Sequence, residues 1–338
     1  MLIWAVFVGF ILLLLAVDLG VLNRRPHAVS TKEAMSWSAV WVAMALAFGA
    51  VVYLGHEHQW MGFGTRPDPV DGHVNDGPRA LIKYLTGYLI EKSLSVDNLF
   101  VIALIFTSMG IPSEHQHRVL HWGVLGALVM RGAMIGLGAE LIARHHWVLY
   151  VFGGFLLVTA GRMLFMGKRG ATAGRQGTAR LLRRWLPVTE QMHGPKFAVR
   201  QAGKWMVTPL ALALLMVEST DAIFAVDSIP AIFAITADPF LVFASNVFAI
   251  LGLRSLYFVL AGMIQRFSYL KVALALVLAL VGAKMLAAHW LRYWIGPGLD
   301  FYLLGLAVLI LAAGVLASLW ATRPTNAKMA LVPETPRD

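Results

Sequence analysis

Apolar residues run in stretches of about 20 or more along most of the chain, separated by mostly short polar connections. A run of this length can cross the hydrocarbon core of a bilayer as one helix. The pattern predicts nine membrane spans, at residues 2–22, 37–55, 80–109, 120–141, 146–166, 206–236, 239–263, 270–289 and 300–321. The chain is therefore expected to be an all-α membrane protein.

The spans are expected to form a single transmembrane domain, residues 1–321, followed by a disordered cytoplasmic tail, residues 322–338. The first stretch, MLIWAVFVGFILLLLAVDLGVL, has no preceding basic segment and no A-x-A cleavage site. It is therefore read as a retained span and not as a signal peptide. The longest connection, residues 167–205, is expected to be a cytoplasmic basic loop.

Composition supports a membrane protein, because 59% of the residues are hydrophobic and only 14% are charged, against about a quarter charged in soluble domains. The chain has no cysteine. This excludes disulfides, thiolate metal ligands and cysteine nucleophiles. No permanently bound cofactor is expected, and no enzymatic activity.

Basic residues decide the orientation of the spans. The loops on one side, together with the tail, contain 18 Lys and Arg residues, and the opposite loops contain 4. The positive-inside rule then places the N-terminus outside and the C-terminus in the cytoplasm. Nine of the basic residues lie in the 167–205 loop, which is expected to contact anionic lipids. A regulatory or partner-docking loop is the alternative, and nucleic acid is not an expected partner.

Three acidic residues interrupt the sixth span, VESTDAIFAVDSIPAIF (217–233), at Glu218, Asp221 and Asp227. Each acid near a span centre costs about 2.5–3.5 kcal/mol on insertion scales, so such residues usually serve a function. Their angular spacing on a helix prevents all three from converging from one regular helix. Pro230 is therefore expected to break the helix near 226–230 and to free backbone carbonyl oxygens as ligands.

A similar acidic motif, EKSLSVDNLFVI (91–102), interrupts the third span. One register against DAIFAVDSIPAI (221–232) pairs Glu91 with Asp221 and Asp97 with Asp227, whereas a competing register pairs Asp97 with Asp221. We prefer the first register. Spans three and six run in opposite directions, so the repeat predicts an inverted-repeat fold in which both long helices are broken and a site lies at the midplane.

The deeply placed acids of the predicted spans outnumber the candidate bases to pair with them. Six acids are deeply placed, namely Asp18, Glu91, Asp97, Glu218, Asp221 and Asp227, and the candidate bases to pair with them are Lys92, Arg131, Arg254 and Lys284. Ion pairing alone leaves unpaired carboxylates, which in lipid are protonated or bind metal. We interpret the acids with Asn98 and Asn246 as a cation site, and Arg254 as a residue that positions one acid.

Carboxylate and amide oxygens without sulfur ligands favour hard divalent cations, namely Mn²⁺, Mg²⁺ or Ca²⁺. Zinc would normally require His or Cys. His117 and His121 are four residues apart and could share a metal, but a hydrated pair at the membrane interface is the preferred interpretation.

Several of these motifs resemble the TerC family of bacterial integral membrane proteins, in its Alx-like branch. They are EKSLSVDNLF, VESTDAIFAVDSIPAIFAIT, SNVFAILGLRSLYF and DLGVLNRRPHAVS, and the resemblance extends over residues 4–321. It implies about nine inner-membrane spans, a role in metal homeostasis with manganese efflux as the expected activity, and a link to tellurium resistance. It points to Asp97, Asn98, Glu218, Asp221 and Asp227 as the ion site, with Asp18 and Glu91 as further candidates.

Exporting a dication from a cell that is negative inside costs about 4.6 kcal/mol per 100 mV. The sequence contains no GxxxxGK[ST] nucleotide-binding loop, so proton antiport is the expected source of free energy. The alternatives are a membrane-bound redox modulator and an accessory membrane protein that does not itself transport. An aspartyl protease is disfavoured because the GxGD signature is missing.

Overall fold

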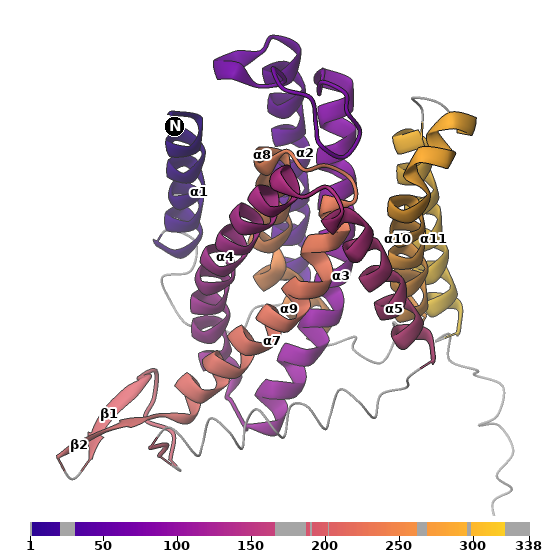
Figure 1. Ribbon diagram of the computed structural model, residues 1–338. Coiled ribbons are helices and arrows are strands. Elements are labelled where there is room, and N and C mark those ends of the chain that lie inside the picture. The colour runs from indigo at the N-terminus through magenta and orange to yellow at the C-terminus, as the bar shows by residue number, and fades with distance from the viewer. Residues whose placement is uncertain are drawn as a thin grey trace, which may run out of the picture.

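The computed structural model describes residues 2–20, 31–165, 187–189, 191–201, 203–261, 269–295 and 299–321. Its helices form an elongated bundle (Figure 1). They are α1 (Leu2–Gly20), α2 (Thr31–Glu57), α3 (Gly77–Ser108), α4 (Ser113–Arg144), α5 (Val148–Phe165), α7 (Pro209–Phe233), α8 (Pro239–Leu251), α9 (Leu253–Ala261), α10 (Leu270–Ile295) and α11 (Leu299–Ala321). Six of the described helical segments are long and apolar enough to cross a membrane. This confirms an all-α, multi-pass membrane protein.

Similar local chemistry starts three of the helices. Asp76, Thr208 and Asp238 each accept a backbone hydrogen bond from the first turn of α3, α7 and α8 respectively. Each of these helices has proline in its first turn, where the missing N–H removes no helical hydrogen bond. The α7 cap also corrects the predicted start at residue 206. Residues 204–207 instead form β2 (Lys204–Val207), which pairs antiparallel with β1 (Ala198–Gln201).

The central helices are arranged as an inverted repeat predicts. In Figure 1, α3 starts at the end of the bundle that carries the short helix η1 (Trp60–Gly62), and α7 starts at the opposite end beside the β-hairpin. Exchanging α3 with α7, α4 with α8 and α5 with α10 maps several helix pairs onto one another. The α3–α8 pair becomes α7–α4, and α5–α7 becomes α10–α3. Each half of the bundle therefore contributes one long central helix.

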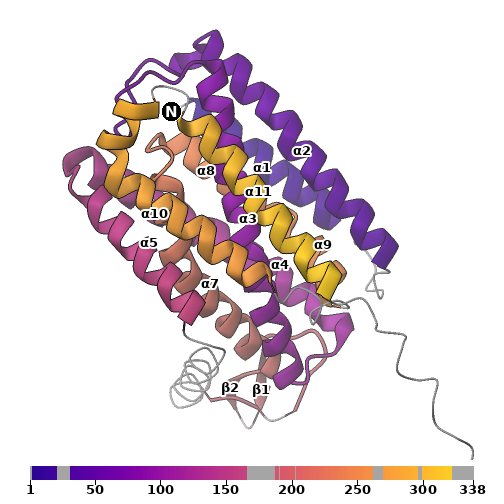
Figure 2. The same ribbon diagram turned by 90° about the vertical axis from the view of Figure 1, so that its right-hand side faces the viewer.

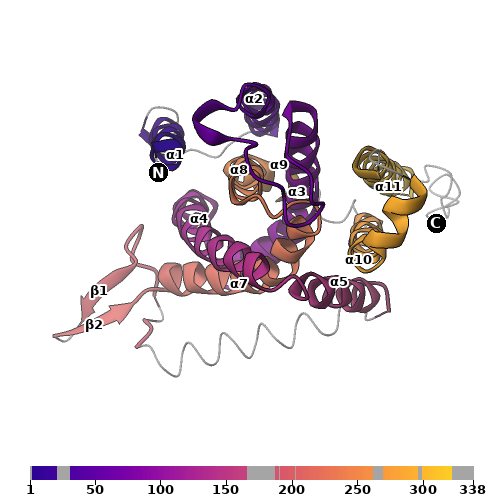
Figure 3. The same cartoon turned by 45° about the horizontal axis from the view of Figure 1, so that its top comes forward.

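Burial separates central from peripheral helices. In an apolar 18-residue stretch within residues 239–259 of α8 and α9, 72% of the residues are buried, compared with 17% in the corresponding stretch of α11. Helices α5, α10 and α11 form a layer on one side of the bundle, and α1 lies at the opposite edge beside α2 (Figures 2 and 3). Phe7 of α1 contacts Phe48, Phe240 and Phe243, so aromatic contacts hold this edge helix in place. The polar side chains of α8 are therefore among the most enclosed in the bundle.

The predicted helix breaks are wrong for spans three and six. Both α3 and α7 are continuous helices, and Pro230 lies within α7. Since this proline is three residues from the end of α7, it removes one hydrogen bond in the last turns and leaves most of the helix intact. The seventh span is the interrupted one, because α8 ends at Leu251 and α9 begins at Leu253. Lys92 Nζ donates to the carbonyl of Ala249 (3.2 Å), which stabilises the end of α8.

Candidate functional site

The buried centre of the bundle contains an arginine that holds two carboxylates. Arg131 of α4 is 1% exposed. Its Nε donates to Asp221 Oδ2 at 3.2 Å, and its Nη2 donates to Asp221 Oδ1 at 3.0 Å. This is the two-pronged geometry that makes arginine–carboxylate pairs strong. Nη1 also donates to Glu91 Oε1, so one guanidinium joins acids from α3 and α7.

Two neutral groups complete the contacts of this guanidinium. Nη1 donates to Asn246 Oδ1 at 3.1 Å and to Ser228 Oγ at 3.3 Å. We call the resulting group the Arg131 cluster, which consists of Glu91, Asn98, Arg131, Asp221, Ser228 and Asn246. It draws on four helices, α3, α4, α7 and α8. Removing one partner from a buried ion pair typically costs 3–5 kcal/mol, so the cluster fixes how these helices pack.

Two oxygen atoms of the cluster lack a hydrogen-bond partner in the described part of the chain. Glu91 is fully buried, and its Oε1 accepts from Ser95 and Arg131 while its Oε2 accepts nothing. Asn98 is also buried, and its Nδ2 donates to Asp221 Oδ1 (3.3 Å) while its Oδ1 accepts nothing. Leaving a buried acceptor unsatisfied costs about 1–3 kcal/mol. A hard cation or a water molecule at these oxygens would recover that free energy.

The cluster brings together the first pair of the preferred repeat register. Glu91 and Asp221, which that register pairs, bind the same guanidinium from α3 and α7. The second pair in that register is Asp97 and Asp227. The side chains of Asp97 in α3 and Asp18 in α1 lie outside the described residues. The choice between the two registers therefore stays a prediction.

The other acids of α7 face different neighbours, as their helical spacing predicts. The Glu218 carboxylate lies against the backbone of α4, where a Cβ atom added at Gly126 would be 2.1 Å from Glu218 Oε1. Asp227 Oδ1 accepts from Thr159 Oγ1 of α5 at 3.3 Å. In an unbroken α7, these three acids thus contact three different surroundings.

The remaining predicted residues lie around the cluster. Lys92 binds the end of α8 as described above, and Lys284 pairs with Asp300 at 2.8 Å, an acid outside the predicted set. Arg254 is half-buried on α9. The rings of His117 and His121 lie against Phe258 and Trp122 respectively. In these contacts, it is Arg131 among the predicted bases that binds acids of α3 and α7.

The described residues contain no group of three or more His, Cys, Asp or Glu side chains arranged to hold a metal ion. Within the cluster, the Arg131 guanidinium lies between two carboxylates, and both oxygens of Asp221 accept hydrogen bonds from it. Metal binding at the predicted residues stays a prediction.

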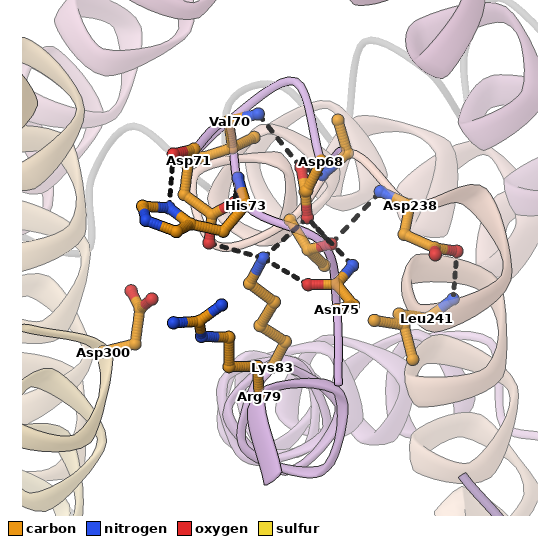
Figure 4. Close-up of polar contacts among 12 residues, drawn as sticks. Asp68, Val70, Asp71, His73, Asn75, Arg79, Lys83, Asp238, Leu241 and Asp300 are labelled. Carbon is orange, nitrogen blue, oxygen red and sulfur yellow. Dashed lines mark hydrogen bonds and ion pairs between the residues drawn. The ribbon is translucent and has the colours of Figure 1, made fainter. Parts of the chain in front are cut away.

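A second buried polar cluster was missed by the sequence analysis. Lys83 of α3, 1% exposed, pairs with Asp68 at 2.9 Å and Asp71 at 2.7 Å and donates to Asn75 Oδ1 at 2.6 Å (Figure 4). The loop before α3 is thereby joined to the turn between α7 and α8, since Thr236 and the Ala237 N–H donate to Asp68. We call Asp68, Asp71, Asn75, Lys83 and Thr236 the Lys83 cluster.

The Asp68 carboxyl shows how firmly the loop is held. Burial raises the pKa of this carboxyl, but the Lys83 ammonium and the hydrogen bonds from Thr236 and Ala237 outweigh burial and hold the pKa below its ordinary value. The available sequence signal was Lys83 itself, a base within an apolar run eight residues before Glu91.

The fold and its buried charges define a class, a multi-pass integral membrane protein with a polar interior. Within that class the family is also clear. Residues 76–326 match the model of the integral membrane protein TerC family, and the chain belongs to that family. This confirms the resemblance found in the sequence.

Relatives match along nearly the whole chain. An Escherichia coli K12 protein named "Putative membrane-bound redox modulator Alx" is 44% identical over 91% of this chain and 89% of its own length. A Salmonella typhi protein of the same name is 42% identical over 97% of both chains. "Uncharacterized membrane protein STKORF319" of Myxococcus xanthus is 44% identical over 96% of this chain and 94% of its own length. No solved structure matches the chain.

Proposed function

We propose that this protein transports a hard divalent cation, Mn²⁺ in the direction of efflux, through the Arg131 cluster. One observation carries the proposal, namely the two buried oxygens of Glu91 and Asn98 that lack hydrogen-bond partners beside Asp221. Amide and carboxylate oxygens are the ligands that such cations prefer. Manganese in particular is what the family resemblance implies.

The proposed path runs between the two halves of the inverted repeat. Glu91 and Asn98 of α3 and Asp221 of α7 supply the oxygens nearest the pseudo-symmetric centre, with Asn246 of α8 beside them. Glu218 and Asp227 lie along α7 on either side of Asp221 in sequence and are proposed as further cation-attracting groups. Asp18 and Asp97 stay candidates from the sequence.

The proposal includes orientation and coupling. The N-terminus lies outside a bacterial inner membrane, the C-terminus lies in the cytoplasm, and the basic 167–205 loop contacts anionic lipids. Efflux works against the membrane potential, so inward movement of protons is the proposed source of free energy. The relatives' printed name favours a second candidate, a redox modulator. This chain has no cysteine, so that role would depend on a bound redox group.

Mn²⁺ flux in sealed liposomes containing the purified protein, with an imposed pH gradient, tests the proposal. Wild type should show gradient-dependent flux, and Asp221→Asn should reduce it to the level of protein-free liposomes, because Asn removes the charge that attracts the cation. Glu140→Gln is the matched control, since Glu140 is exposed and pairs only with its exposed neighbour Arg144 among its recorded contacts. Folded wild-type protein that moves no Mn²⁺ would leave the redox and accessory functions.

A further inference from the structure

The Arg131 guanidinium occupies the acceptors that a divalent cation needs. Mg²⁺-like and Ca²⁺-like ions require about six or more oxygen ligands. Among the recorded contacts, the cluster leaves Glu91 Oε2 and Asn98 Oδ1 unbonded, while Arg131 engages both oxygens of Asp221. Asp221 Oδ1 already accepts from both Asn98 and Arg131, so a dication cannot bind both oxygens of Asp221 while these hydrogen bonds persist.

Charge leads to the same conclusion. Two carboxylates and one guanidinium carry a formal charge of −1, which a dication would convert to +1 in a buried site. If the guanidinium leaves Asp221 as the dication arrives, the two carboxylates are neutralised by the dication alone. At low effective dielectric, charge interactions at contact distance amount to several kcal/mol, so this exchange is favoured over simple addition.

Glu218 offers the displaced guanidinium a second carboxylate. It lies one helical turn before Asp221 on α7, and its carboxylate contacts α4 at Gly126, five residues before Arg131. The side chain of a helical residue leans toward the N-terminus of its helix, which is the axial direction from Arg131 to Gly126. Because residues five apart lie about 140° apart around a helix, the guanidinium must also turn around α4 to reach Glu218. No hydrogen bond to the Glu218 carboxylate is recorded among the described residues, in contrast to the carboxylate of Asp221.

We propose that Arg131 is an internal competitor for the transported cation, which binds Asp221 when the site is empty and moves to Glu218 when a dication binds. This inference rests on the proposed transport function and adds a positioning role for Arg131 and Glu218. Return of the guanidinium to Asp221 then expels the dication, which keeps affinity low enough for release. Arg131 thereby sets both affinity and turnover.

The test compares Mn²⁺ affinity and flux in the same variants. Affinity is measured on purified protein from the loss of the free Mn²⁺ signal in electron paramagnetic resonance, and flux is measured in liposomes. Arg131→Met should bind Mn²⁺ at least about tenfold more tightly than wild type, equivalent to about 1.4 kcal/mol, and transport it more slowly. Arg131→Lys keeps the charge but loses the two-pronged contact, so its affinity should lie between the two.

A double-mutant cycle assigns the role of Glu218. Glu218→Gln should weaken Mn²⁺ binding clearly more in wild type, where the displaced guanidinium loses its second partner, than in the Arg131→Met background, where only the attraction of its charge is lost. Equal weakening in both backgrounds would make Glu218 a direct ligand and overturn the exchange. If Arg131→Met fails to fold, the Arg131→Lys background supports the same cycle, with a reduced effect of Glu218→Gln expected.

The two proposals fail in different ways. Absence of both binding and flux in wild type removes the transport function itself. Normal binding and flux in wild type, together with equal or weaker Mn²⁺ affinity in folded Arg131→Met and Arg131→Lys, removes only the exchange. A purely structural Arg131 would lower thermal stability in these variants without raising their affinity.

Discussion

The Arg131 and Lys83 clusters are built from the same parts but differ in completeness. Each contains one cation that is 1% exposed, two carboxylates, an asparagine oxygen that accepts from the cation, and a hydroxyl group. In the Lys83 cluster, Asp68 accepts from Lys83, Asn75, Thr236 and two backbone N–H groups. In the Arg131 cluster, by contrast, two buried oxygens accept nothing.

This difference indicates different duties. A buried polar network whose groups are all bonded holds one arrangement, because every alternative loses hydrogen bonds. The Lys83 cluster thus acts as a clamp that fixes the loop of residues 63–76 against α3 and the α7–α8 turn (Figure 4). The Arg131 cluster has two buried oxygens without a hydrogen-bond partner, and the carboxylate of Glu218 lies nearby. Its guanidinium can therefore change partners.

Replacing Lys83 and Arg131 is the strongest test of the difference between the two clusters. Lys83→Met should lower the free energy of unfolding by about 3–5 kcal/mol, since it leaves Asp68 and Asp71 without their buried partner. Added Mn²⁺ should not restore this stability. In Arg131→Met, Mn²⁺ should recover much of the loss by binding the released carboxylates.

Thermal unfolding in detergent, with and without Mn²⁺, makes this measurement. Arg144→Met provides the control, because Arg144 forms an exposed pair with Glu140 and should change stability by less than about 1 kcal/mol. If added Mn²⁺ restored the stability of Lys83→Met and Arg131→Met equally, the two clusters would not differ in function.

Low pH should weaken the Lys83 cluster by protonating Asp68. Because the pKa of this carboxyl is held below its ordinary value, it contributes stability that is fully present above about pH 4 and is lost as the pH falls through the lowered native pKa. Asp68→Asn should cost on the order of 1–3 kcal/mol at neutral pH and should flatten this acid dependence. The measurement is unfolding free energy against pH from 7 to 3 for both proteins, and parallel curves would contradict it.

The bundle could be predicted from the sequence because every span must be apolar over the length that crosses the lipid. Apolar length alone located the helices, whereas the position of the interruption between α8 and α9 depended on contacts between helices. Pro230 lies too near the end of α7 to divide it, while the α8–α9 interruption at Gly252 is stabilised by Lys92 of α3. Which helix would supply that ammonium cannot be read from a linear pattern.

The sequence pointed to residues of the Arg131 cluster but not to their arrangement. Acids in apolar spans are costly, so Glu91 and Asp221 were visible as functional candidates, and the structure brings both to one guanidinium. Their shared partner, Arg131, depends on α4 packing against α7 and lies outside the repeated motif. Asp68 and Asp71 lie in a loop rich in turn-forming residues, where solvated acids are ordinary, so nothing marked them as partners of a buried lysine.

A single methyl group on α4 offers the finest test of the comparison. Gly126→Ala would place a Cβ atom 2.1 Å from Glu218 Oε1, so the flexible end of Glu218 must move away from α4. Because that carboxylate can rotate, we expect a stability loss below about 1 kcal/mol. The displaced Glu218 can no longer receive Arg131, so Mn²⁺ affinity should fall in the same direction as in Glu218→Gln.

Gly136→Ala is the matched control on the same helix. An added Cβ there meets no atom within 4 Å, and alanine favours a helix over glycine by roughly 0.5–1 kcal/mol. Stability should therefore rise slightly while Mn²⁺ affinity stays at the wild-type value. Unchanged affinity in Gly126→Ala, with Glu218→Gln impaired, would show that Glu218 acts without its contact to α4. A fall in both glycine variants would instead assign the effect to the flexibility of α4, because only position 126 touches the carboxylate.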